Sequence, residues 1–198
     1  MNDFSPQLTQ QLGAAIAITA VLSVLTLILL YAGIPFFGPV NDLITAVGGI
    51  LIAGLALQFH ALLGDEISGL ALILLLIAWA GAALIAVNAV LVAFGQMDWM
   101  LGGMYTAVGY ALVGVWLLGM LLVLRGLPPM DAGLMRLGLI GGTAMLFGFL
   151  AGPLLAGRLE IAVKPLVWAA YAAAGAGFII FPIWCWRLAA KLKDTLIV

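Results

Sequence analysis

The stretch SGLALILLLIAWAGAALIAVNAVLVAF, residues 68–94, decides the fold, because it carries no charged side chain along its whole length. The hydrocarbon core of a bilayer is roughly 30 Å thick, and a helix needs about 20 residues to cross it. Lipid offers the backbone no hydrogen-bond partners, so a continuous apolar run of this length is expected to be a transmembrane helix.

Further runs of the same kind account for most of the remaining chain. Of the 198 residues, 66% are hydrophobic and 8% are charged, which leaves no room for a sizeable water-soluble domain. We therefore predict an all-α polytopic membrane protein that forms a single transmembrane domain over residues 1–198. Its six helices are expected near residues 12–33, 41–63, 68–94, 100–124, 134–156 and 165–188.

The distribution of Lys and Arg predicts the orientation. Cytoplasmic loops of membrane proteins carry an excess of basic residues. In the predicted topology, the side that holds both termini has more of them than the opposite side, so we expect both termini to be cytoplasmic. The first side holds Arg125, Arg136, Arg187, Lys191 and Lys193, and the second holds Arg158 and Lys164.

A short internal repeat suggests that the six helices are three related helical hairpins. The sequence TAVG at residues 45–48 recurs at residues 106–109, and the same spacing leads from Tyr110 to Tyr171. Repeats of this kind occur in transporters. The alternative is coincidence, because Ala, Val, Gly and Leu dominate the composition.

Pairs of glycines four residues apart mark the predicted fifth helix. Gly138 and Gly142 form one pair, and Gly148 and Gly152 form another. Small residues at this spacing let helix backbones approach closely in lipid. We expect internal packing, with this helix near the centre of the bundle. A dimer face is the alternative.

The densest set of polar and aromatic side chains falls at one depth, on the outer side, where the predicted second, fourth and sixth helices begin and where Asn88 lies in the outer part of the third. We predict a shallow, outward-facing ligand pocket with apolar walls. The alternatives are that these side chains bond neighbouring helices, or that Asn41 and Asp42 cap the second helix. The candidate ligand-binding residues are Asn41, Asp42, Asn88, Tyr105, Thr106, Tyr110, Trp168 and Tyr171.

His60 is the only histidine in the chain. A single histidine cannot form a bis-histidine haem site or a histidine-rich zinc site. It remains a weak candidate for the axial ligand of a porphyrin-type pigment, and the alternative is an interfacial side chain at the cytoplasmic end of the second helix. We predict no metal site and no cofactor.

Several function classes are disfavoured. Ionisable residues are scarce in the middle of the predicted spans, which argues against a proton pump or a sodium-coupled carrier. The chain has no GxSxG or Walker motif, so we do not expect an enzyme. A net charge of −1 and the lack of a basic patch argue against nucleic acid as a partner.

Three stretches, FGPVNDL (37–43), GYALVGVWL (109–117) and FPIWCW (181–186), resemble a family of uncharacterised bacterial six-helix membrane proteins. The resemblance implies a location in the bacterial inner membrane and no particular activity. Size and helix count are also similar to those of the substrate-binding subunits of vitamin uptake transporters, although their loop motifs are missing here.

Taken together, these features predict a non-catalytic, multi-pass bundle in the bacterial inner membrane. It would bind a small hydrophobic or amphipathic ligand or serve as a subunit of a larger membrane complex. The alternative is a transporter or permease component for an uncharged small molecule. The expected partners are membrane lipid and, in the second case, other membrane-protein subunits.

Overall fold

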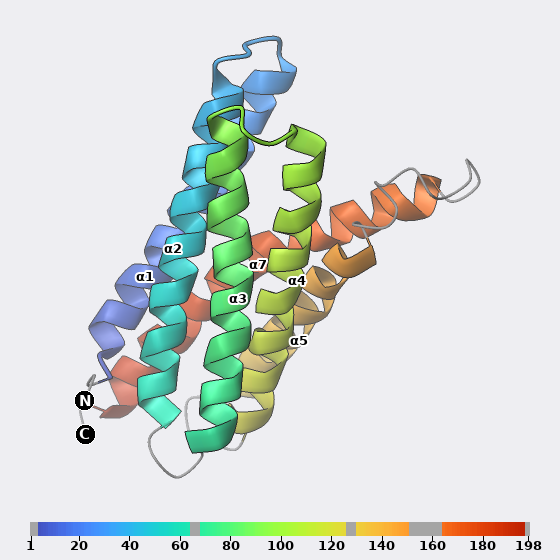
Figure 1. Ribbon diagram of the computed structural model, residues 1–198. Helices are drawn as coiled ribbons and strands as arrows, with labels where there is room; N and C mark the ends of the chain where they lie inside the picture. The colour runs from blue at the N-terminus through green and yellow to red at the C-terminus, as the bar shows by residue number, and fades with distance from the viewer. Residues whose placement is uncertain (1–3, 64–67, 126–129, 151–163, 197–198) are drawn as a thin grey trace.

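The computed structural model describes residues 4–63, 68–125, 130–150 and 164–196. These residues form helices and connecting turns, and the described part of the chain contains no strand (Figure 1). The all-α prediction is therefore confirmed. The helices are α1 (Pro6–Tyr31), α2 (Phe37–Leu63), α3 (Ser68–Ala93), α4 (Trp99–Leu124), α5 (Ala132–Leu146) and α7 (Lys164–Leu196).

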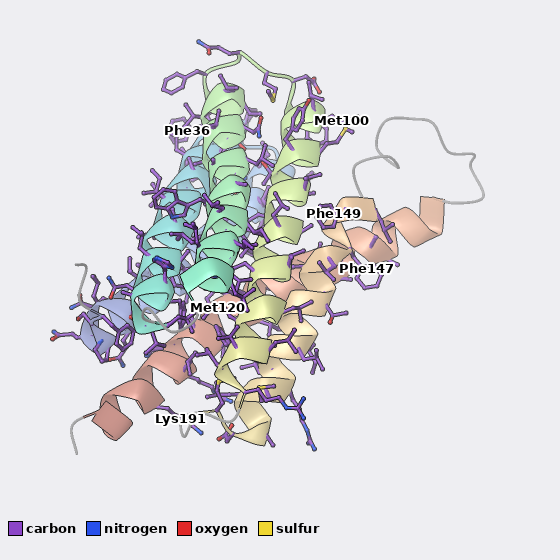
Figure 2. All side chains as sticks on the ribbon, turned by 60° about the horizontal axis from the view of Figure 1, so that its bottom comes forward. Phe36, Met100, Met120, Phe147, Phe149 and Lys191 are labelled. Carbon is purple, nitrogen blue, oxygen red and sulfur yellow. The ribbon has the colours of Figure 1, made fainter. Side chains whose placement is uncertain are left out.

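The surface of the bundle is apolar. Helices α1 to α4 are long and apolar enough to cross a membrane, as is the segment Ala132–Leu150 that contains α5, and α7 holds a shorter apolar stretch, Ala172–Leu188. Large aliphatic side chains point outward, among them Ile50 (66% exposed) and Leu122 (74%). Carbon predominates along the flanks of the bundle in Figure 2. Such a surface suits lipid as its solvent, because soluble monomers rarely expose large apolar patches.

The six helices form a ring. Each packs against the next along the chain, and α7 returns to contact α1 and also touches α4. The backbone N–H of Ser5 donates to Oε1 of Gln58 (3.0 Å), and Asp131 forms an ion pair with Lys191. These residues, together with the start of α1 and the end of α7, define what we call the near end of the bundle (Figure 1).

Helix α2 begins earlier than the sequence suggests. A tight turn in which Gly33 adopts a positive φ of 93° leads directly into the helix at Phe37. Pro39 is tolerated in the first turn, where its missing N–H has no intrahelical acceptor in any case. Asn41 and Asp42 therefore lie inside the helix, and the interpretation of this pair as caps is wrong. The end of the bundle that holds this turn and Trp99 is called the far end.

Other helix boundaries also differ from the predicted ones. The prediction follows hydropathy, which locates the apolar segment that crosses the membrane, whereas a helix can extend beyond that segment. Helix α1 starts at Pro6, where the Ser5 side chain accepts from the N–H of Leu8 (3.2 Å). Helix α7 continues to Leu196, well past the apolar stretch. Helix α5 ends at Leu146 and a turn follows at Phe147, after which residues 148–150 are again helical; residues 151–156 of the predicted helix lie outside the described part of the chain.

Aromatic side chains fill the middle of the ring. Phe59 of α2 contacts Trp116 of α4 and Trp184 of α7, with ring centroids 5.7 and 5.8 Å apart. Trp116 also meets Phe181 at 6.0 Å. All four are at most 1% exposed. Towards the far end, α7 leans away from α1 and α2 (Figure 1), so the ring widens there.

Close backbone contacts hold neighbouring helices together. A Cβ atom on Gly109 of α4 would lie 2.7 Å from the carbonyl oxygen of Gly81 on α3, so only glycine fits. The internal packing expected for the glycines of the predicted fifth helix is found for Gly138 and Gly142 of α5 and for Gly148, just after it, each of which faces α4 or α7. Gly152 lies outside the described residues. Helix α5 packs against α4 and α7, whereas α4 and α7 each pack against three of the described helices, so these two, rather than α5, are the most central.

Candidate functional site

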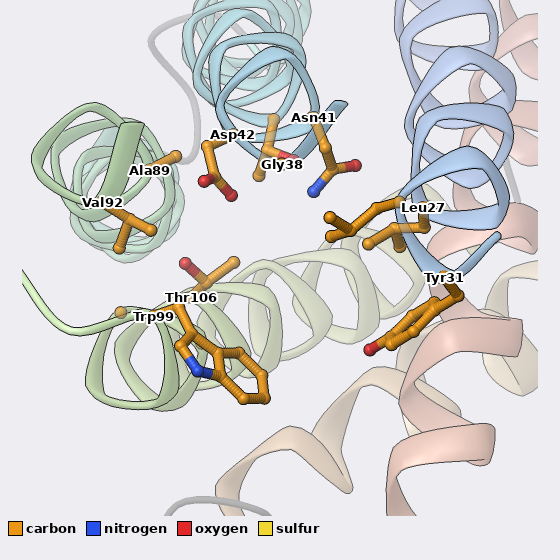
Figure 3. Close-up of a pocket in the computed structure, with 13 residues that line it drawn as sticks. Leu27, Tyr31, Gly38, Asn41, Asp42, Ala89, Val92, Trp99 and Thr106 are labelled. Atoms are coloured by element: carbon orange, nitrogen blue, oxygen red, sulfur yellow. The ribbon is translucent and has the colours of Figure 1, made fainter. Parts of the chain in front are cut away.

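A cavity of about 260 Å³ lies at the far end, between α1, α2, α3 and α4, and we call it the polar cavity (Figure 3). Its polar lining includes Asn41, Asp42, Thr45 and Thr106, and Tyr31 and Trp99 stand at its border. Leucine, valine, alanine and glycine residues make up the rest of its wall.

Two further spaces continue from the polar cavity. The middle cavity, about 350 Å³, shares Leu27, Asn41, Thr45, Gly103 and Thr106 with it and reaches Tyr110 of α4 and Phe178 of α7. The lateral groove, about 270 Å³, shares Val24 and Ile179 with the middle cavity and runs between α1 and α7. Apart from backbone atoms, the lateral groove is lined by apolar side chains alone.

Asn41 is held by helix α1. Its Oδ1 accepts a hydrogen bond from the hydroxyl of Ser23 (2.6 Å). The hydroxyl of Thr26 lies 3.2 Å from the same oxygen and 2.9 Å from carbonyl oxygens of its own helix, which compete for its single proton. The two hydroxyl residues are three apart and so lie on one face of α1. Because the amide oxygen is directed towards α1, the amide nitrogen of Asn41 faces the cavity (Figure 3).

Asp42 is a half-buried carboxylate in the wall of the polar cavity. In Figure 3 it points into the cavity, with Thr106 on the opposite wall. Its interaction partner is the side chain of Asn41, and no Lys or Arg among the described residues pairs with it. A carboxylate within a membrane span is costly and is normally paired or placed at a functional cavity.

The two copies of the TAVG sequence meet at this site. Thr45 of α2 and Thr106 of α4 both line the polar and the middle cavity. The Thr45 hydroxyl is 3.5 Å from that of Ser23. The Thr106 hydroxyl has no hydrogen-bond partner among the described residues. The repeat therefore places one hydroxyl on each of two facing helices.

Of three further sequence candidates, one lines a cavity and two do not. Tyr110 lines the middle cavity and packs edge-on against Phe178, with ring centroids 4.9 Å apart. Asn88 is buried and donates from Nδ2 to the carbonyl oxygen of Leu84 in its own helix (2.6 Å). Neither Asn88 nor Tyr105, which is 43% exposed, lines any of the three spaces.

The other sequence candidates add nothing to the site. Trp168 and Tyr171 belong to α7, but their side chains lie outside the described part of the structure. His60 lies towards the near end of α2 and lines none of the three spaces; its buried Nδ1 has no partner among the described residues. Within the described ranges, no group of three His, Cys, Asp or Glu side chains is placed to hold a metal ion.

Several lining residues are not among the sequence candidates. Ser23 and Thr26 could have been found as hydroxyls three residues apart in an otherwise apolar run, and Thr45 through the repeat. Gly103 and Phe178 carry no comparable signal in the sequence, because small and aromatic residues occur throughout the helices.

Comparison of the chain with models of protein families, with curated proteins and with solved structures finds no match. The function is therefore inferred from the geometry of the site.

Proposed function

We propose that this protein is a non-catalytic membrane bundle that binds a small amphipathic molecule in the polar and middle cavities. The observation that supports this most strongly is the convergence of Asn41, Asp42, Thr45 and Thr106, from two facing helices, on one space with otherwise apolar walls. A few polar groups in a largely apolar concavity are typical of small-molecule sites.

Unused hydrogen-bonding groups support the proposal. Among the described residues, neither the hydroxyl of Thr106 nor that of Tyr110 has a hydrogen-bond partner, and the carboxylate of Asp42 has no cation. Polar groups inside a protein are normally satisfied by protein, water or ligand. A bound molecule with a polar head would satisfy these groups from within the cavity.

The volume of the site fits the same interpretation. The middle cavity, at about 350 Å³, falls in the usual range for ligand sites, which begins at roughly 300 Å³. Polar groups are concentrated towards the far end, and Leu27, Phe178 and Ile179 line the deeper part. An occupant with one polar end and one apolar end matches this gradient.

We place the protein in the bacterial inner membrane, with its near end in the cytoplasm and the cavity at the outer side. The basic residues Arg125, Arg136 and Lys191 support this orientation, because they lie at or beside the near-end termini of α4, α5 and α7.

Native mass spectrometry of the protein in mild detergent tests the proposal. Gly103 lines both cavities, and a Cβ atom added there would meet nothing within 4 Å. A Gly103→Leu substitution would therefore fill the site without a backbone clash. Gly69, near the start of α3, is equally open and lines none of the three spaces, so Gly69→Leu is the matched control.

We expect the wild-type protein and Gly69→Leu to retain a bound small molecule or to take up added amphiphiles, and Gly103→Leu to lose them. Equal retention by all three proteins would show that binding occurs elsewhere. A wild-type protein that neither carries nor takes up any amphiphile would contradict the proposal.

A further inference from the structure

We propose that the bound amphiphile is a long-chain organic cation, with its protonated amine held at Asp42 and its chain leaving through the lateral groove. This inference rests on the proposed function and specifies the chemical class of its ligand. It follows from the charge, the aromatic rings and the continuity of the three spaces.

The charge of the polar cavity favours a cationic head group. Asp42 is the only carboxylate in its lining, and none of the described lining residues of the three spaces is Lys or Arg. In a membrane span, a carboxylate is stabilised by an opposite charge. An amine that donates hydrogen bonds to this carboxylate would supply that charge, and the bond would be of the strong, charge-assisted kind.

The same observation disfavours a phosphate-bearing head group. A phosphodiester next to Asp42 would place two negative charges together in a medium of low dielectric constant, and no described cation lines the cavity to offset them. The head group is therefore expected to be an amine without a phosphate.

Aromatic rings border the same cavity. Trp99 and Tyr31 stand at its border, and Figure 3 shows Trp99 on the wall opposite Asp42. Organic cations bind to the faces of Trp and Tyr rings. The carboxylate and the rings thus favour the same class of head group.

The lateral groove offers a route for the chain. It adjoins the middle cavity through Val24 and Ile179, which are 38% and 51% exposed, so it opens on the lipid-facing surface. Figure 1 shows α7, which forms one wall of the groove, diverging from α1 towards the far end. An acyl or alkyl chain could extend from the polar cavity along this path into the bilayer without losing apolar contacts.

Photolabelling in lipid nanodiscs tests the inference. The probes are tetradecylamine and tetradecanol, each carrying a diazirine at the same position of the chain, and the labelled residues are identified by mass spectrometry. The proteins are wild type, Asp42→Asn, and Asp98→Asn as the control. Asp98 is another far-end aspartate, but it caps α4, does not line the cavity, and can be replaced by Asn as a cap.

For wild type and Asp98→Asn, we expect the amine to label the middle cavity and the lateral groove at about tenfold lower concentration than the alcohol. In Asp42→Asn, the two probes should label equally. Equal labelling of wild type by both probes, or an unchanged amine preference in Asp42→Asn, would overturn the cation inference and leave ligand binding intact. Labelling by either probe that Gly103→Leu does not reduce would instead contradict the proposed function.

Discussion

The hydroxyl of Ser23 on α1 donates a 2.6 Å hydrogen bond to Oδ1 of Asn41 on α2. The hydroxyl of Thr26 lies 3.2 Å from the same oxygen, although carbonyl oxygens of its own helix at 2.9 Å compete for its proton. The bond from Ser23 joins two helices at the depth of the cavities and sets the direction of the Asn41 amide. The interhelical hydrogen bond and the proposed ligand site therefore share Asn41.

Replacing Ser23 by Ala removes the hydrogen bond to Asn41 and should lower the free energy of unfolding by about 1 kcal/mol, the usual size of an interhelical hydrogen bond in membranes. Thermal unfolding can be followed by the reaction of a thiol-specific dye with Cys185, which is the only cysteine and is buried. Thr19→Val is the control, because the Thr19 hydroxyl bonds only within its own helix, to the oxygen of Ile16 (2.8 Å). An equal effect of both substitutions would contradict the interhelical role.

Replacing either of two glycines in α4 by alanine should have different effects on the stability of the protein. Gly109→Ala would press a methyl group against the carbonyl oxygen of Gly81, at 2.7 Å, and should destabilise the protein by about 1–3 kcal/mol. Gly103→Ala meets open space and should be neutral or slightly stabilising, because alanine favours the helix. The same dye assay on Cys185 compares them, and a Gly109→Ala protein as stable as wild type would contradict the α3–α4 packing.

The ion pair at the near end predicts a dependence of stability on pH. The carboxylate of Asp131 accepts hydrogen bonds from the side chain of Lys191 and from the backbone N–H of Leu134, and these bonds lower the pKa of Asp131 below its ordinary value of 3.8. The ionised carboxylate therefore stabilises the folded state. This contribution is fully present above the ordinary value and is lost as the pH falls through the lower pKa of the folded protein.

Asp131→Asn isolates this effect, because Asn can still cap α5 while the charge is removed. We expect a lower melting temperature than wild type at neutral pH, measured by tryptophan fluorescence, and convergence of the two proteins in acid below the pKa of Asp131. Asp131→Ala, which also loses the cap, should be less stable than Asp131→Asn at every pH. If the difference in melting temperature between wild type and Asp131→Asn became larger in acid, this result would argue against the ion pair.

The orientation can be tested with single cysteines. In a Cys185→Ser protein, a cysteine at Gln7 reports the near end and one at Gln96 reports the far end. In intact bacterial cells, a membrane-impermeant maleimide should label the far-end cysteine and not the near-end one. The reverse pattern would place the cavity on the cytoplasmic side.

The sequence predicts the helices well, because continuous apolar runs have no stable alternative to helices in lipid. Of the six expected crossings, five are long and apolar enough among the described residues, and α7 holds a shorter apolar stretch. The sequence predicts the site only in part. Asn41, Asp42, Thr106 and Tyr110 line the cavities, whereas Asn88 bonds to its own helix. In a helix that is apolar on nearly every side, hydrophobic periodicity does not show which face is inward.

The course of α2 illustrates a second limit. Gly38 and Pro39 are typical of a break, yet the helix has already begun at Phe37. The middle cavity and the lateral groove depend on how far α7 leans from α1, and residues distant in the sequence, such as Phe59 and Trp184, pack together to hold α7 in place. No local pattern encodes that angle.

The most direct measurement is an experimental structure of the wild-type protein in lipid nanodiscs. Ligand binding between the helices predicts elongated density that begins beside Asp42 and Thr106 and follows the middle cavity towards Ile179. A structure in which α7 closes against α4 and fills these spaces with its own side chains would contradict it.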